Sequence, residues 1–143
     1  MENPFDVLRA KMAERKLTYA DLGKTIGRNP VYVAAVLHGQ QRLHPPEAEK
    51  LAAALGAPEA VATLTACPVR TEFPITTDPF KYRLLEIVGV YGDPLRAMAN
   101  EMFGDGIMSA IDFTMDVEKV TGKEGEARMK ITMCGKWLPY KQF

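Results

Sequence analysis

Apolar residues in the first half of the chain recur at the spacing of an α-helix, in short runs separated by glycine or proline. The first run, from Asn3 to about Lys16, places Phe5, Leu8 and Met12 on one face. Similar runs predict helices over residues 19–26, 29–39, 46–55 and 59–66, and a glycine lies at or just after three of these ends. The pattern therefore predicts a bundle of five short helices over residues 1–68.

Four of the predicted helix starts share a local signature, an asparagine or aspartate followed by proline. The short polar side chain accepts a hydrogen bond from a free N–H group of the first turn. Proline at the first helical position gives up an N–H group that would have no partner there. Thr18 with Asp21 similarly predicts a reciprocal cap on the second helix. The proline signature predicts helix starts at Asn3-Pro4, Asn29-Pro30, Asp78-Pro79 and Asp93-Pro94.

After residue 68 the periodicity changes. Residues 69–77, which include Pro74, predict an extended linker, and two helices are predicted over 79–91 and 94–103. The first of these helices carries an apolar stripe that begins at Phe80 and reaches Tyr91 through Leu84, Ile87 and Val88. Beyond it, apolar and polar residues alternate from Ile111 to Glu118, and again around Ile131, which predicts a β-hairpin with its turn at residues 121–126.

These elements predict an α+β fold in two domains. Residues 1–68 form a helix-turn-helix-like bundle, 69–77 the linker, and 78–143 a small α+β domain whose size predicts oligomerisation. A chain of about 70 residues buries only about 60% of its surface, and a lone hairpin is marginal in water. We therefore expect the apolar surface of the second domain to be covered in an intertwined dimer or a larger assembly.

The spacing of residues 20–39 resembles a helix-turn-helix of the repressor type, which raises the possibility of DNA binding. A helix that reads bases in the major groove needs Arg, Lys, Asn or Gln side chains. Between Arg28 and His38 the corresponding helix reads NPVYVAAVL, and its asparagine is placed to cap the helix. The net charge is zero, with 18 Lys and Arg against 18 Asp and Glu. We therefore predict that the bundle does not bind nucleic acid.

Composition and termini exclude further classes of protein. No apolar run is long enough to span a membrane, and the N-terminus MENPFDVLRA lacks the apolar core of a signal peptide. The expectation is a cytoplasmic protein. The chain has two cysteines and two histidines without metal-ligand spacing, so no metal site is predicted.

Three residues are candidates for chemistry. Arg83 and Glu86 lie three apart on one flank of a predicted helix, away from the stripe that begins at Phe80. Ser109 lies in the stretch FGDGIMSAIDF, after a Gly-Asp-Gly turn and just before the predicted strand. Taken singly, the Arg83–Glu86 pair is typical of an exposed ion pair, and the serine of a hydroxyl that satisfies a turn amide.

Together these residues belong to a longer pattern. The run TDPFKYRLLEIVGVYGDPLRAMANEMFGDGIMSAIDF, with GKWLP near the end, closely resembles the cyanase (cyanate hydratase) family, and the resemblance extends over the whole chain. It implies bicarbonate-dependent decomposition of cyanate to carbon dioxide and carbamate, which breaks down to ammonia. It also implies an enzyme without metal or organic cofactor, and a homodecamer of five dimers with sites where subunits meet. The catalytic residues it implies are Arg83, Glu86 and Ser109.

The chemistry of these residue types fits two anionic substrates. The guanidinium group of Arg83 can bind a carboxylate-like anion through two hydrogen bonds. We expect Ser109 to donate a hydrogen bond to developing negative charge and not to act as a nucleophile, because the motif holds no histidine to activate it. Glu86 is expected to orient Arg83 and to relay a proton. The alternative is a helix-turn-helix transcription regulator with an anion-sensing oligomerisation domain, against which the apolar third helix and zero net charge argue.

Overall fold

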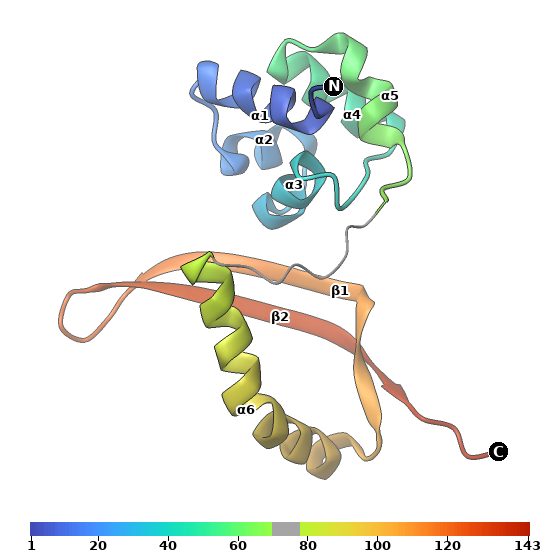
Figure 1. Ribbon diagram of the computed structural model, residues 1–143, viewed down its shortest axis with the longest axis vertical. Helices are drawn as coiled ribbons and strands as arrows, with labels where there is room; N and C mark the ends of the chain where they lie inside the picture. The colour runs from blue at the N-terminus through green and yellow to red at the C-terminus, as the bar shows by residue number, and fades with distance from the viewer. Residues whose placement is uncertain (70–77) are drawn as a thin grey trace. The chain divides into compact units, whose positions relative to one another are not determined.

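In the computed structural model the described residues, 1–69 and 78–143, form the predicted α+β fold. Two strands, β1 (Gly106–Thr121) and β2 (Ala127–Pro139), pair as a hairpin (Figure 1). The helices are α1 (Pro4–Glu14), α2 (Tyr19–Ile26), α3 (Pro30–Leu37), α4 (Pro45–Leu55), the short 3-10 helix η1 (Pro58–Ala60), α5 (Val61–Thr65) and α6 (Pro79–Phe103).

Helices α1 to α5 gather around one apolar core (Figure 1). The five predicted helices are confirmed, except that the last one divides into η1 and α5. Leucines from α2, α3, α4 and α5 are almost completely buried, and each such side chain contributes about 1.5–3 kcal/mol of transfer free energy. The core consists of Leu8, Leu22, Ile26, Val33, Val36, Leu37, Leu43, Ala48, Leu51, Ala52, Leu55, Ala57, Ala60 and Leu64. This half of the chain therefore has a core of its own.

The predicted caps are present on four helices. The side chain of Asn3 accepts a hydrogen bond from the Phe5 N–H group at 3.0 Å, and Asp78 accepts one from Lys81 at 2.9 Å. Asn29 caps α3 in the same way. At α2 the reciprocal cap is complete, because the hydroxyl of Thr18 accepts from the Asp21 N–H group and the Asp21 carboxylate accepts from the Thr18 N–H group.

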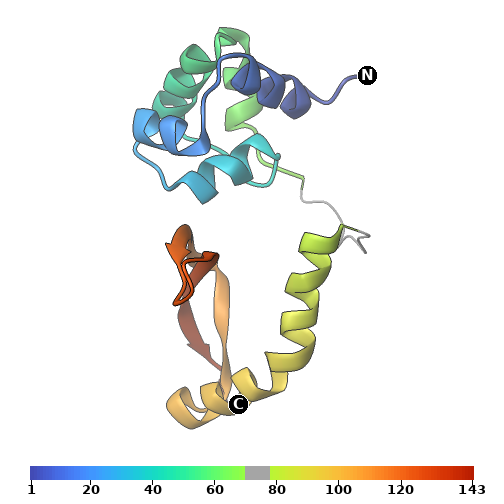
Figure 2. The same cartoon turned by 90° about the vertical axis from the view of Figure 1, so that its left-hand side faces the viewer.

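The predicted break between two C-terminal helices is wrong. Residues 79–103 form the single helix α6, and Pro94 lies inside it. A proline within a helix removes one backbone hydrogen bond and crowds the preceding turn, which a bend can relieve. Figure 2 shows that α6 bends along its length and continues. The Asp93-Pro94 signature therefore marks a bend and not a helix start.

The apolar surface of α6 is uncovered in the single chain. None of its residues is buried, and the side chains of Phe80, Val88 and Tyr91 are exposed at 54%, 65% and 56%. An exposed apolar surface of this extent marks an interaction site in a soluble protein. It is the surface that the predicted assembly would cover.

The hairpin begins earlier than predicted. β1 starts at Gly106, so Ser109 lies within the strand and not before it. The turn between the strands falls inside the predicted segment, and the Gly122 N–H group donates to the carbonyl oxygen of Glu126 at 2.8 Å. Nearly all of the predicted linker lies outside the described residues, so the domain boundaries stay a prediction.

An ion pair ties the start of α4 to the residues before α3. Arg28 Nε lies 2.6 Å from Glu47 Oε1, and Arg28 Nη2 lies 3.2 Å from Glu47 Oε2. The hydrogen bond from the Arg28 guanidinium holds the pKa of Glu47 below its ordinary value. Because the folded-state pKa is depressed, the stabilisation is present above the unfolded-state pKa and is lost as the pH falls through the folded-state pKa.

We expect Glu47→Gln to lower the free energy of unfolding by about 1 kcal/mol near neutral pH, since a partly exposed charged hydrogen bond is lost. The difference from the wild type should shrink below about pH 4, where the wild-type carboxylate also takes up a proton. Urea denaturation at the two pH values measures both effects. Glu49→Gln, at an exposed position of the same helix, should change little. A difference that is equal at both pH values would contradict the role of this charge.

Candidate functional site

The first part of the candidate site is an ion pair on α6. Arg83 Nε lies 3.7 Å from Glu86 Oε2, one helical turn away, and the guanidinium carbon is 5.6 Å from the centroid of the Tyr82 ring. Both side chains are half exposed or more in the single chain. Water therefore screens the pair, and its contribution to stability in this state is small.

This pair lies beside apolar residues in an open groove on α6. Arg83, Glu86, Ile87, Val90 and Tyr91 line the groove. The prediction that the pair lies away from the apolar stripe is therefore wrong, because Ile87 and Tyr91 belong to both. Positions four apart on a helix differ by only about 40° in direction, so Arg83 and Ile87 share one face. Any partner that covers the apolar part of this face also removes water from the pair.

The second part of the candidate site is Ser109, in β1. Its side chain is 6% exposed. Its Oγ accepts hydrogen bonds from the backbone N–H groups of Ile111 at 3.1 Å and Asp112 at 2.9 Å. A serine hydroxyl has two acceptor positions and one hydrogen to donate. Since both acceptor positions are taken, the hydrogen is the part of this group that remains for a ligand.

Glycine is required at three positions around Ser109, for different structural reasons. Gly104 ends α6 with φ of +83°, a value that favours glycine. A Cβ atom on Gly106 would lie 2.5 Å from the carbonyl oxygen of Leu138, and one on Gly135 would lie 2.4 Å from that of Ser109. The two strands therefore approach too closely for any side chain at Gly106 or Gly135. Sequence reasoning missed Gly135, because this contact joins residues far apart in the chain.

Contacts from both neighbouring elements hold the turn that leads to Ser109. The ring of Phe103, at the end of α6, stacks on Trp137 of β2 with 4.7 Å between ring centroids. The Tyr140 N–H group donates to the carbonyl oxygen of Asp105 at 3.2 Å. Arg96 Nη1 donates to the carbonyl oxygen of Gly106 at 2.7 Å. The start of β1 is therefore fixed from the α6 side and from the β2 side.

The structure joins only two of the three candidate residues directly. Arg83 and Glu86 form an ion pair. Within the described part of one chain, no hydrogen bond or ion pair connects Ser109 to either of them. The complete predicted site is thus not assembled through direct contacts within one chain.

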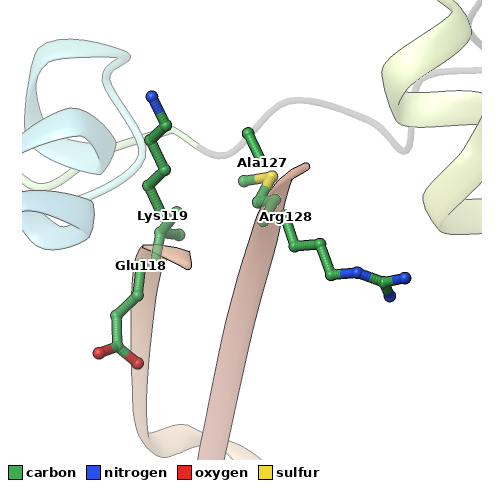
Figure 3. Close-up of a pocket in the computed structure, with 6 residues that line it drawn as sticks. Glu118, Lys119, Ala127 and Arg128 are labelled. Atoms are coloured by element: carbon green, nitrogen blue, oxygen red, sulfur yellow. The ribbon is translucent and has the colours of Figure 1, made fainter. Parts of the chain in front are cut away.

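A second hollow, on the hairpin, is a weaker candidate for binding an anion. Figure 3 shows Glu118 and Lys119 on one strand pointing away from each other, and Arg128 on the other strand projecting outward. Arg128 is paired with Glu126 at 2.7 Å, and Glu118 with Lys130 at 3.7 Å. Because Glu118 itself is acidic and Arg128 already has an acidic neighbour, this hollow does not concentrate positive charge.

Side chains able to hold a metal ion are not clustered in the described residues, where no three His, Cys, Asp or Glu side chains come together. Cys67 and Cys134 are exposed and unpaired with each other. No helix in residues 1–69 or 78–143 is both long and apolar enough to cross a bilayer.

Two protein families match the two parts of the chain. Residues 74–142 match the cyanate lyase C-terminal domain. Residues 6–64 match a helix-turn-helix domain. These two segments together include most of the N-terminal bundle and all of α6 and the hairpin.

Related sequences and a solved structure match the chain over nearly its full length. A cyanate hydratase from Synechococcus sp. (strain CC9311) is 46% identical over 99% of this chain and 97% of its own length. A cyanate hydratase from Synechococcus elongatus is 49% identical over 96% of this chain and 94% of its own. The crystal structure of cyanase from T. urticae has a TM-score of 0.86 and 35% identity, and covers 95% of this chain and 96% of that one.

We expect Ser109→Ala to leave the N–H groups of Ile111 and Asp112 without their acceptor. The free energy of unfolding should fall by about 2 kcal/mol, because buried donors lose their partner, and these two amides should exchange hydrogen faster. Hydrogen–deuterium exchange with urea denaturation measures both effects. Thr18→Ala is the matched control, since its hydroxyl also accepts from a backbone N–H group, but in α2. Unchanged exchange at residues 111 and 112 would contradict the two hydrogen bonds.

Proposed function

We propose, since the chain belongs to the cyanate hydratase family, that it is a lyase that decomposes cyanate with bicarbonate. The products are carbon dioxide and carbamate, and carbamate breaks down to ammonia and more carbon dioxide. The observation that carries the proposal is that the family match includes a candidate site with two groups suited to small anions. These groups are the guanidinium of Arg83 and the hydroxyl of Ser109.

The electrostatics of the reaction require a fixed positive charge. Cyanate and bicarbonate each carry one negative charge, so they repel each other and their adduct is a dianion. The repulsion of two unit charges at about 4 Å is about 1 kcal/mol in water and about 4 kcal/mol at an effective dielectric constant of 20. The guanidinium group of Arg83 can offer two parallel N–H groups to one anion. It is our candidate for the group that binds the substrates.

Ser109 is proposed as a hydrogen-bond donor to the negative charge that develops in the reaction. Its Oγ already accepts two backbone N–H groups. An attacking serine needs a free lone pair and a base, and the motif contains no histidine. A donor that is fixed before the reaction begins stabilises developing charge without reorganisation.

Glu86 is proposed to orient Arg83 and to relay a proton. Its carboxylate lies 3.7 Å from the guanidinium, close enough to restrict its orientation. An ionised carboxylate beside two anions is repulsive, so a role in the chemical step requires that Glu86 carry a proton for part of the cycle. These side chains supply the proposed chemistry without a metal or organic cofactor.

We propose a homodecamer of five dimers in the cytoplasm, with sites where subunits meet. The uncovered surface of α6 and the absence of a direct Arg83–Ser109 contact in one chain both support shared sites. The transcription-regulator alternative finds no support in α3. This helix buries Val33, Val36 and Leu37 in the bundle and carries no basic side chain.

The first test is ammonia release from cyanate, with and without bicarbonate. We expect the wild type to require bicarbonate and Arg83→Gln to lose at least roughly 100-fold in kcat/KM, because charge stabilisation is removed. Glu86→Gln should alter the pH dependence of kcat, which rate measurements across pH would detect. Lys50→Gln, an exposed change in α4, should behave as wild type. No ammonia from the wild type would reject the proposed reaction.

The second test asks whether one site draws on two chains. Arg83→Gln and Ser109→Ala chains are co-expressed, and the mixed assemblies are separated by two affinity tags. If the two residues meet across an interface, some sites in the mixture are intact, and activity should rise well above that of either parent. Activity that stays at the level of the parents would place both residues of each site in the same chain.

A further inference from the structure

Besides the two-residue backbone connection, one side-chain hydrogen bond in the described residues links the two elements that carry the proposed site. Arg83 and Glu86 belong to α6, and Ser109 belongs to β1. In the described part of the chain, the hydrogen bond from Arg96 Nη1 to the Gly106 carbonyl oxygen, 2.7 Å long, is the one side-chain hydrogen bond between these elements. The bond is partly buried, and its donor is charged, so it is stronger than a bond between neutral groups.

Gly106 is held on its other side by β2. The residue is buried, and its Cα lies so close to Leu138 and Trp137 that an added Cβ would be 2.5 Å from the Leu138 carbonyl oxygen and 2.9 Å from the Trp137 ring. Gly106 therefore cannot move toward β2. On the α6 side the guanidinium of Arg96 donates to its carbonyl oxygen, so Gly106 is in contact with both neighbouring elements.

The position of Gly106 determines that of Ser109. The two residues lie three apart in one strand, about 10 Å along it, with no loop between them. Ser109 is itself packed against β2, because Gly135 approaches its carbonyl oxygen. A displacement at the start of β1 is thus transmitted to the serine hydroxyl through extended, packed backbone.

We propose that Arg96 is a positioning residue for the reaction, which fixes the start of β1 against α6 and thereby the position of the donor Ser109. The inference rests on the proposed function. Arg96 itself is engaged with a backbone carbonyl and has no assigned contact with substrate. Its effect on catalysis passes through Ser109.

The test compares Arg96→Met, which keeps the length of the side chain and removes its donors, with Arg96→Lys, which keeps a charge and a donor. We expect Arg96→Met to lower kcat by at least roughly tenfold, because small displacements of catalytic groups are costly. The KM for cyanate should change by less than about threefold, since substrate binding at Arg83 is retained. Arg96→Lys should recover most of the loss in kcat.

The control removes a bond of the same kind from another place. Arg9 Nη1 donates to the Leu37 carbonyl oxygen at 2.5 Å, within the helical bundle. Arg9→Met should lower the unfolding temperature and leave kcat unchanged. An equal fall in kcat for Arg9→Met and Arg96→Met, or a failure of lysine to restore kcat, would reduce Arg96 to a general structural role and overturn the proposal.

Hydrogen–deuterium exchange gives a readout that does not depend on activity. The N–H groups of Ile111 and Asp112 report on Ser109, because both donate to its Oγ. We expect these amides to exchange faster in Arg96→Met, while amides of the bundle are unaffected. Unchanged exchange would overturn the positioning role, even if the wild type decomposes cyanate. If the wild type shows no cyanate activity but the exchange changes as expected, the proposed function fails and the structural link stands.

Discussion

The stability of the second half of this chain depends on apolar surface that a single copy leaves in contact with water. Along α6 the large apolar side chains are exposed at fractions from 36% for Leu85 to 67% for Met102. The first five helices, in contrast, enclose a complete leucine-rich core. Since burial of apolar area is the main favourable term in folding, α6 and the hairpin need a partner surface far more than the bundle does. In the proposed assembly, the stability of this half would depend on protomer concentration.

The exposed apolar surface also determines the electrostatic surroundings of the ion pair on α6. Arg83 and Glu86 share a groove with Ile87 and Tyr91, so any surface that covers the apolar residues also excludes water from the charges. In water the pair contributes little, whereas in a less polar surrounding the same guanidinium attracts an anion much more strongly. Covering this face of α6 would therefore both bury its apolar side chains and strengthen the binding of an anion at Arg83.

Much of the fold could be predicted from interactions between residues close in the sequence. The features that could not be predicted depend mainly on contacts between distant residues. The caps at Asn3, Thr18 and Asp78 depend on neighbours within three positions, so their residue types identify the helix starts. The predicted helix break at Asp93-Pro94 was wrong, because a bend in α6 accommodates the proline ring without ending the helix. The start of β1 depends on the close approach of β2, which no local pattern reveals. Spacing predicted the Arg83–Glu86 pair, and the family motif supplied Ser109. The groove beside the pair is lined by residues of α6 alone, whereas the position of Ser109 depends on contacts with β2 that the local pattern does not reveal.

The hydrogen bonds at Ser109 have a consequence for reagents that modify serine. Fluorophosphonates and carbamoylating compounds react through a lone pair on the hydroxyl oxygen, and at this residue both lone pairs are shared with backbone amides. Modification would first require that β1 release two hydrogen bonds inside a packed strand pair. In the proposed site, these two hydrogen bonds would protect Ser109 from carbamoylation by cyanate and similar electrophiles, the class of compound that the site would process.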